Sequence, residues 1–209
     1  MNYCLAAICA FTFSGCNQAA SSSVMDGDLI FQTSSSSQSL AIQRATGSPY
    51  SHMGIIFIRK GKPYVLEAIS TVRYTPLERW VARGKGRHFV VKRLKNAASM
   101  LTPSAIQKLR DNAKRFEGKA YDLAFDWSDR RIYCSELVWK IYDRALGLKI
   151  GDLQPISQFN LSDPVVKAKL KQRYGDRVPK SEPAISPASM FNSPMLVTAV
   201  ADSSALLHE

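Results

Sequence analysis

Two β-rich runs on either side of a tight turn form the clearest pattern of apolar and polar positions in the chain. The runs SHMGIIFIR and KPYVLEAI flank a turn at Lys60 and Gly61. Glycine readily takes the positive φ that a tight hairpin turn requires, so this pattern predicts a β-hairpin. If the loop has two residues, Arg59 pairs with Lys62 at the end of the ladder.

The register of this hairpin places three positions on one face. Counting back from the pair of Arg59 and Lys62 sets Glu67 opposite Gly54, and side chains alternate between faces along a strand. His52, Gly54 and Glu67 therefore point to the same side. Glu67 is diagonal to His52 and within reach of its ring, and glycine leaves the space between them open. The turn type alone thus predicts a His and Glu pair.

Apolar residues at helical spacing predict two longer helices. The first covers 102–118, with Thr102 as its N-cap and Pro103 at its first helical position. The second begins at Cys134 and ends at Gly147, which can take the left-handed conformation of a helix C-terminus. The second helix therefore opens on a cysteine.

Shorter patterns predict the remaining elements. Residues 26–32 form a turn and a short apolar strand, 39–48 a short helix, and 87–94 a strand with basic flanks. We expect 167–184 to be a basic, loosely structured excursion. The segment 185–200 should return to the body as a short helical turn and an edge strand.

The N-terminal residues have the character of an export signal. Residues 1–16 hold an apolar run that ends in the lipobox-like FSGC, too short to span a bilayer as a mature helix. Cys16 is the candidate lipidation site, and an ordinary cleaved signal without lipid is the alternative. We expect 17–24 to be a Ser-rich linker, 25–202 a single domain and 203–209 a frayed tail. The predicted location is the cell envelope, as an exported lipoprotein anchored in the membrane.

Composition and charge limit the class of partner. Of 209 residues, 45% are apolar and 22% charged, which argues against both a disordered chain and a multispanning membrane protein. The 28 Lys and Arg against 17 Asp and Glu give a net charge of +11, which favours anionic lipid, an acidic cell-wall polymer or nucleic acid. The basic runs 83–95 and 167–180 contain few aromatic residues for base stacking, and an exported protein seldom meets nucleic acid. We therefore expect no nucleic-acid partner.

Cys134 is the one cysteine in the predicted domain, because Cys4, Cys9 and Cys16 all lie in the leader. An intramolecular disulfide is therefore excluded there, and a free thiol in an oxidising compartment calls for a reason. One interpretation is a small buried apolar residue. The other is a nucleophile, since unpaired N–H groups and the helix dipole at a helix start favour a negatively charged thiolate.

A nucleophilic cysteine needs a base, and His52 is the best candidate in the chain. His88 lies among basic residues, and His208 is next to the C-terminus. His52 could act as the base for Cys134 with Glu67 orienting it, and the backbone N–H of Cys134 could donate to an oxyanion. No Cys and His pairs occur at metal-ligand spacing, so we expect neither a metal ion nor another cofactor.

Four motifs in a fixed order carry a resemblance to a known family. DGDLIF, YSHMGIIF, VLEA and YCSELVWKIY resemble the YiiX/YebB-like branch of the circularly permuted papain-like cysteine hydrolases of the NlpC superfamily. Lecithin retinol acyltransferase is a more distant relative of that branch. The His strand precedes the cysteine helix here, which is the mark of the permutation. The resemblance implies an α+β fold in which a small antiparallel sheet of about five strands packs against the cysteine helix.

The resemblance also implies roles for individual residues. Cys134 corresponds to the nucleophile, His52 to the general base and Glu67 to the third polar residue. The residues that precede His52 and Cys134 are candidates for substrate contact: Tyr50, Ser51 and Tyr133.

The function expected from these observations is that of a cysteine hydrolase or acyltransferase. It would cleave an amide, ester or thioester through a Cys acyl-enzyme, on a lipid-like or N-acylated substrate. One alternative is a cell-wall peptide amidase or endopeptidase. Another is a non-catalytic lipoprotein that keeps the fold as a ligand pocket, although a binding protein has no need of Cys134, His52 and Glu67 together. The expected partners are a small or acylated substrate and an anionic lipid or cell-wall polymer, with membrane association through the lipid anchor.

Overall fold

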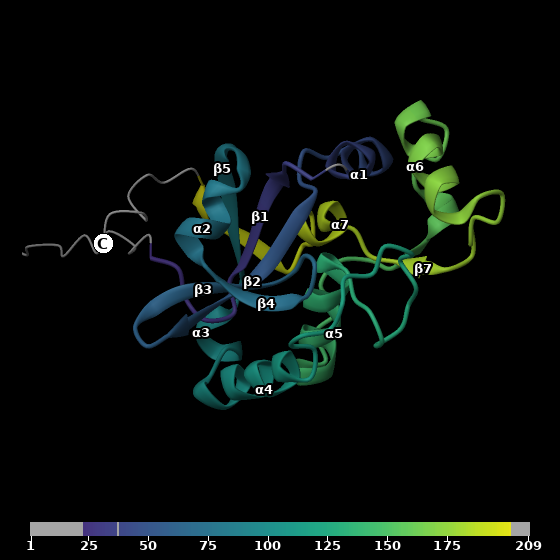
Figure 1. Ribbon diagram of the computed structural model, residues 1–209. Helices are drawn as coiled ribbons and strands as arrows, with labels where there is room; N and C mark the ends of the chain where they lie inside the picture. Colours follow the sequence, from purple (N-terminus) through teal and green to yellow (C-terminus); the bar gives the residue numbers. More distant parts are fainter. Residues whose placement is uncertain (1–22, 37, 202–209) are drawn as a thin grey trace, which may run out of the picture.

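The computed structural model describes residues 23–36 and 38–201, and Cys16, the leader and the tail after 202 lie outside them. A six-stranded antiparallel sheet with the order β4-β3-β2-β1-β5-β8 forms the centre of the described part (Figure 1). Its strands are β1 (Leu29–Ser34), β2 (His52–Arg59), β3 (Lys62–Ala68), β4 (Val72–Pro76), β5 (Gly84–Leu94) and β8 (Leu196–Ala201).

Seven α-helices occur among the described residues, with a short second sheet near the C-terminal end. The helices are α1 (Ser39–Thr46), α2 (Leu77–Ala82), α3 (Ala97–Met100), α4 (Pro103–Lys114), α5 (Cys134–Leu146), α6 (Pro164–Tyr174) and α7 (Pro187–Phe191). The second sheet pairs β6 (Gln154–Pro155) with β7 (Pro183–Ala184), and a 3₁₀ turn η1 covers Ile156–Gln158. No helix in 23–36 or 38–201 is long and apolar enough to cross a membrane.

The main sheet is covered on both faces, because alternate residues of its central strands are apolar on each side. Leu29 and Phe31 belong to a large cluster with the buried faces of α4 and α5, whereas Ile30 packs with α2 on the other face. Figure 1 shows α5 and α4 on one side of the sheet and α2 on the other. The expected packing of the sheet against the cysteine helix is confirmed.

The hairpin has the register expected from its turn. Arg59 pairs with Lys62, and Lys60 and Gly61 both have positive φ, at 50° and 75°, as a tight two-residue turn requires. Gly54 has a further role in packing. A Cβ there would approach the Val65 side chain within 2.4 Å, so glycine allows close packing on β3.

Both longer helices begin as predicted. Thr102 caps α4 by accepting a hydrogen bond from the N–H of Ala105, with Pro103 in the first turn. The cysteine helix α5 begins at Cys134 and stops at Gly147, whose φ is 70°. Helix α4 ends at Lys114, one turn earlier than the predicted range.

Two expectations were wrong. The sheet has a sixth strand, β4, whose alternation of Arg73 and Thr75 with apolar residues is too short to stand out from a loop. The start of the predicted loose excursion, 167–184, belongs instead to a regular helix, α6. Asp163 caps this helix, accepting from the N–H of Val165 over 2.8 Å. Charged residues alternate with apolar ones along α6, so the sequence shows no helical period of apolar positions. Packing on α1 stabilises the helix instead. The helical turn and edge strand expected in 185–200 are confirmed as α7 and β8.

Candidate active site

His52 and Glu67 meet at one end of the β2 and β3 hairpin. His52 is the first residue of β2 and Glu67 is next to the last residue of β3, so the register sets them diagonally across the ladder. His52 Nε2 lies 2.7 Å from Glu67 Oε2, and both side chains are buried. The pair predicted from the turn type is present.

Two side chains from the next segments hold the other carboxylate oxygen of Glu67. Thr75 Oγ1, on β4, donates to Glu67 Oε1 over 2.6 Å, and the Arg83 guanidinium, just after α2, pairs with the same oxygen. Burial alone would raise the pKa of Glu67, but the hydrogen bond to His52 and the other partners outweigh burial and lower the pKa. Glu67 is therefore an ionised carboxylate at neutral pH, able to orient and stabilise a protonated imidazole.

Cys134 begins α5 and lies beside His52, whose pKa it raises. Because His52 Nε2 faces Glu67, Nδ1 is the ring nitrogen left for the sulfur. Burial would lower the pKa of His52, but hydrogen bonds and charge from Cys134 and Glu67 outweigh burial and raise the pKa to about 9. The indole of Trp80, on α2, stacks on the imidazole with ring centroids 5.8 Å apart. His52 is thus a protonated imidazole at neutral pH, oriented by Glu67 beside the start of the cysteine helix.

The residues on either side of Cys134 both form hydrogen bonds with the backbone of Ile185. The N–H of Ile185 donates to the Tyr133 hydroxyl over 3.1 Å, and Ser135 Oγ donates to the Ile185 carbonyl over 2.8 Å. Glu136 Oε2 also accepts from the N–H of Tyr133 over 3.4 Å, which satisfies a free donor at the helix start. These contacts fix the position of the cysteine relative to β7.

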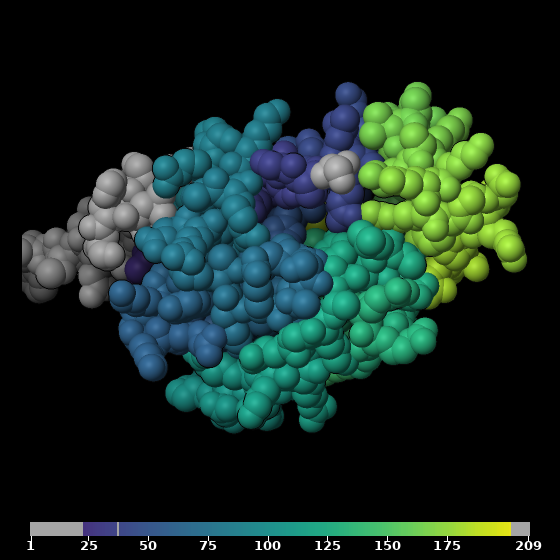
Figure 2. Space-filling view, in the orientation of Figure 1, coloured from purple at the N-terminus to yellow at the C-terminus, as the bar shows by residue number. Residues whose placement is uncertain are grey.

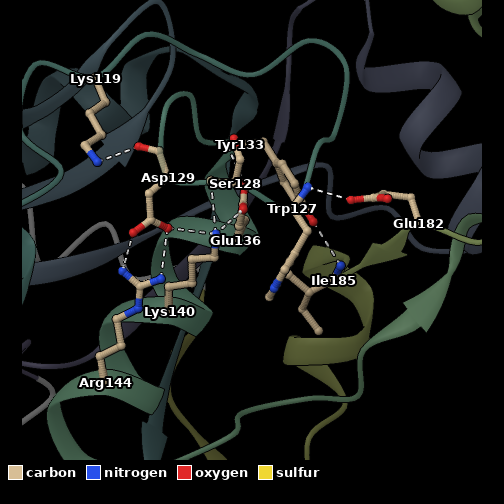
Figure 3. A network of polar contacts seen from close by, with 10 residues as sticks. All are labelled: Lys119, Trp127, Ser128, Asp129, Tyr133, Glu136, Lys140, Arg144, Glu182 and Ile185. Carbon is tan, nitrogen blue, oxygen red and sulfur yellow. Dashed lines mark hydrogen bonds and ion pairs between the residues drawn. The ribbon is translucent and has the colours of Figure 1, made fainter. Parts of the chain in front are cut away.

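An ion-pair network, buried at Glu136 and Lys140 and exposed at Asp129 and Arg144, continues along the same helix (Figure 3). Lys140 Nζ donates to Glu136 Oε1 over 2.7 Å, and to Asp129 Oδ1 and the Ser128 carbonyl over 3.0 Å each. Arg144 binds Asp129 through two hydrogen bonds. Burial raises the pKa of Glu136 to about 7, although Lys140 acts against this shift. The network joins the cysteine helix to the loop before it.

An apolar cavity opens beside Cys134. Its walls come from the inner faces of α1 and α6, the first residues of α5 and the segment around β7. Most lining side chains are apolar, among them Ala41, Ala45, Phe159, Val166, Leu170 and Ile185.

A second cavity, the polar cavity, lies on the His52 side and has a more polar lining than the first. Its lining includes the side chains of Ser34, Ser35, Ser36, Ser51, His52 and Arg83. Gln38 and Tyr121 line both cavities, and Gln38 Nε2 donates to the Tyr121 hydroxyl over 2.7 Å. The candidate catalytic pair thus lies between an apolar and a polar compartment that share two residues.

The three residues expected to contact substrate have different surroundings. Tyr133 lines the apolar cavity and Ser51 the polar one, where Ser51 Oγ also accepts from the N–H of Ser34 over 2.9 Å. The Tyr50 ring stacks on Phe191 at 4.2 Å, outside the lining of either cavity. Substrate contact by these three residues stays a prediction.

Sequence reasoning missed several residues of the site: Gln38, Thr75, Trp80, Arg83 and Tyr121. None lies in the four motifs, and they come from segments that meet the hairpin only through tertiary packing. A cation beside a buried glutamate could have been expected. With 28 Lys and Arg in the chain, the sequence could not single out which one.

Two comparisons with known proteins agree with this geometry. The chain is 51% identical to the uncharacterized protein YiiX of Escherichia coli (strain K12) over 172 residues, which are 82% of this chain and 84% of that protein. It also matches a crystal structure of metalloprotein yiiX from Escherichia coli O157:H7, with a TM-score of 0.82 and 49% identity over 85% of this chain and 97% of that one.

The word metalloprotein in that structure's title raises the question of a metal site in this chain. Among residues 23–36 and 38–201, no group of three or more His, Cys, Asp or Glu side chains lies close enough together to hold a metal ion. The described donor groups therefore do not fit a metal ion held by three or more of these side chains.

The family comparison covers nearly all of the described chain. A family model for the permuted papain-like amidase enzymes of the YaeF/YiiX type, family C92, matches residues 23–200. That range holds the sheet, the cysteine helix and both cavities. The chain therefore belongs to the permuted papain-like amidases of the C92 family and is a cysteine hydrolase of the amidase kind.

Proposed function

We propose that the protein hydrolyses an N-acyl or O-acyl bond of a lipid-like substrate, with Cys134 as the nucleophile. His52 serves as general acid and base, and Glu67 orients the imidazole and stabilises its positive charge. The observation that carries this proposal is the His52 and Glu67 pair, with 2.7 Å between the imidazole and the carboxylate, beside Cys134 at the start of α5.

The steps follow the protonation states of these groups. Cys134 Sγ, as a thiolate, attacks the carbonyl carbon and forms an S–C bond, while the N–H of Cys134 donates to the developing oxyanion. The bond to the leaving group then breaks, and the leaving group takes the proton of His52. Water enters, gives a proton back to His52 and attacks the thioester, which releases the acid and restores the thiolate beside protonated His52.

The two cavities suit the two parts of the substrate, the leaving group and the acyl group. Because His52 protonates the leaving group, that group must lie on the His52 side, where the polar cavity offers hydroxyl groups and Arg83. The acyl group stays on the sulfur and extends into the apolar cavity beside Cys134. An apolar acyl chain with a polar head fits this division, and it buries more apolar surface than a cell-wall peptide would.

The apolar cavity gives a test of chain length. Ala45→Phe should lower kcat/KM for a long-chain acyl ester by about tenfold, because the added ring occupies space that the acyl chain needs. The same variant should leave kcat/KM for an acetyl ester within about twofold. Hydrolysis of both esters by purified protein provides the measurement.

Ala168→Phe is the matched control, since Ala168 is an exposed residue of α6 outside the cavity lining. Equal loss on the long and the short ester in Ala45→Phe would contradict acyl binding in this cavity. Preference for a cell-wall stem peptide over both esters would favour the alternative amidase or endopeptidase function.

The raised pKa of His52 predicts an alkaline limit to activity. The imidazolium form is the acid that protonates the leaving group, so kcat/KM should fall about tenfold per pH unit above pH 9. Glu67→Gln removes a negative charge that raises the pKa of His52, and the limit should then move down by about one pH unit or more. The pH dependence of kcat/KM for an acyl ester measures both.

Glu117→Gln, which removes the same charge from an exposed residue, should leave the profile unchanged. An alkaline limb at the same pH in Glu67→Gln and in the unchanged protein would contradict the proposed role of the carboxylate. Thermal unfolding of both variants separates a shift in pH dependence from loss of structure.

Export and a lipid anchor at Cys16 are part of the same proposal. They are supported by the leader sequence alone, since residues 1–22 lie outside the described part of the chain.

A further inference from the structure

The segment that contains α6 carries a dense positive charge. Residues 164–180 include six Lys and Arg residues and one acidic residue, Asp176. Lys167 and Lys171, one turn apart on α6, are exposed, as are Arg177 and Lys180 beyond its end. The hydrolysis steps above use none of these four cations.

This charge lies at the wall of the apolar cavity. Helix α6 packs on α1, and its inner face supplies Val166 and Leu170 to the cavity. Lys167 and Lys171 are outside the cavity lining, on the solvent side of the same helix. Figure 1 shows α6 beside α1 at the periphery of the molecule, and Figure 2 shows its segment in light green as a projecting part of the surface.

Exposed apolar side chains accompany the cations. Leu40 on α1 is 47% exposed and Val165 on α6 is 38% exposed, two of the few large apolar side chains that are exposed in the described part of the chain. A groove lined by Leu40, Arg44 and Asp163 joins the outer face of α1 to the start of α6. Cations and exposed apolar groups thus occur together next to the cavity.

We propose that this surface, formed by the outer faces of α1 and α6, docks on a bilayer that contains anionic lipid. Lysines beside a negatively charged bilayer are attracted to it, and Leu40 and Val165 can enter the interface. An acidic polymer would satisfy the charges but offer nothing to the apolar side chains, so the combination favours a bilayer. The proposal rests on the proposed function for its purpose, because docking would bring the apolar cavity to membrane-borne acyl chains.

Vesicle sedimentation tests the docking without any turnover. Full-length protein with Cys16→Ala, which removes the candidate lipid anchor, is mixed with vesicles of phosphatidylcholine alone or with an equal amount of phosphatidylglycerol. We expect binding to the anionic vesicles that weakens at high salt. Lys167→Glu with Lys171→Glu should weaken it about tenfold or more, since both attractions become repulsions.

The control variant carries the same change of charge on a helix far from α6. Lys108→Glu with Lys114→Glu places two exposed substitutions on α4, on the other side of the molecule from α6 (Figure 1). If the α4 double variant weakened vesicle binding as much as the α6 double variant, the proposed docking surface would be wrong. It would also be wrong if the protein showed no preference for anionic vesicles. Leu40→Ser with Val165→Ser should also weaken binding several-fold. Unchanged binding there would show that Leu40 and Val165 do not enter the interface, and it would overturn the argument that favours a bilayer over an acidic polymer.

Hydrolysis of a water-soluble acetyl ester without vesicles distinguishes this proposal from the proposed function. The α6 double variant should hydrolyse it at the normal rate and lose turnover only of ester held in anionic vesicles. Loss of turnover in solution as well would count against a pure docking role. Vesicle binding by a protein that hydrolyses neither ester would retain the docking surface and overturn the proposed function.

Discussion

Cys134→Ala is expected to lower kcat/KM for an acyl ester on the order of 10⁴-fold or more, because removal of a covalent nucleophile leaves only binding and oxyanion stabilisation. The same thiol should react with iodoacetamide faster than a model thiol at neutral pH. The partner that makes it reactive is His52, which lies beside it and carries a proton below pH 9. His52→Ala should therefore remove the labelling advantage as well as the activity.

Cys16→Ala provides the matched cysteine control, since Cys16 precedes the family domain, which begins at residue 23. Turnover by purified Cys16→Ala should equal that of the unchanged protein. Labelling of Cys134 at the rate of a model thiol would refute the nucleophile, and retained turnover in Cys134→Ala would do the same. Thermal unfolding of Cys134→Ala confirms that the loss is chemical, since Cys134 is also a buried residue.

Lys140→Ala is expected to lower the free energy of unfolding by about 3 to 5 kcal/mol at pH 8. Lys140 and Glu136 are both buried, and removal of the ammonium group leaves the carboxylate charged without its closest partner. Burial raises the pKa of Glu136 to about 7 in the folded protein. The folded state therefore loses stability relative to the unfolded state as pH rises toward that value and the buried carboxyl ionises. At pH 5 the carboxyl is protonated in the folded protein, and the loss in Lys140→Ala should be smaller. Chemical denaturation at the two pH values measures the difference.

Lys108→Ala removes an exposed lysine and should change stability by no more than about 0.5 kcal/mol. Lys140→Met combined with Glu136→Gln removes both charges, and it should recover most of the loss because no buried charge remains. A loss in Lys140→Ala of the same size at pH 5 and pH 8 would show that packing, and not the charge of Glu136, determines the effect.

The parts of the protein that could be predicted from sequence are those set by neighbouring residues. The turn at Lys60 and Gly61 fixes the register of the hairpin, and the register by itself brings His52 and Glu67 together. The apolar period after Cys134 and the stop at Gly147 define the cysteine helix. In each case the information lies within one hydrogen-bonded element, so local geometry is sufficient.

The elements that the sequence did not predict depend on contacts between distant segments. Strand β4 is short, and the contact of Arg83 with Glu67 depends on the pairing of β3 with β4 and on the position of α2. Helix α6 is stabilised by packing on α1, and no local sequence pattern predicts that contact.

By itself, the sequence determined the candidate catalytic residues and the order of the elements that hold them. Only the tertiary structure decided what surrounds those residues: the cation that pairs with Glu67, the ion-pair network along the cysteine helix, and the apolar and polar cavities on either side of the pair. The physical reason is that turn geometry and helix capping act over a few residues. Burial, charge pairing and cavity shape arise only when segments more than 40 residues apart, such as Gln38 and Tyr121, are packed together.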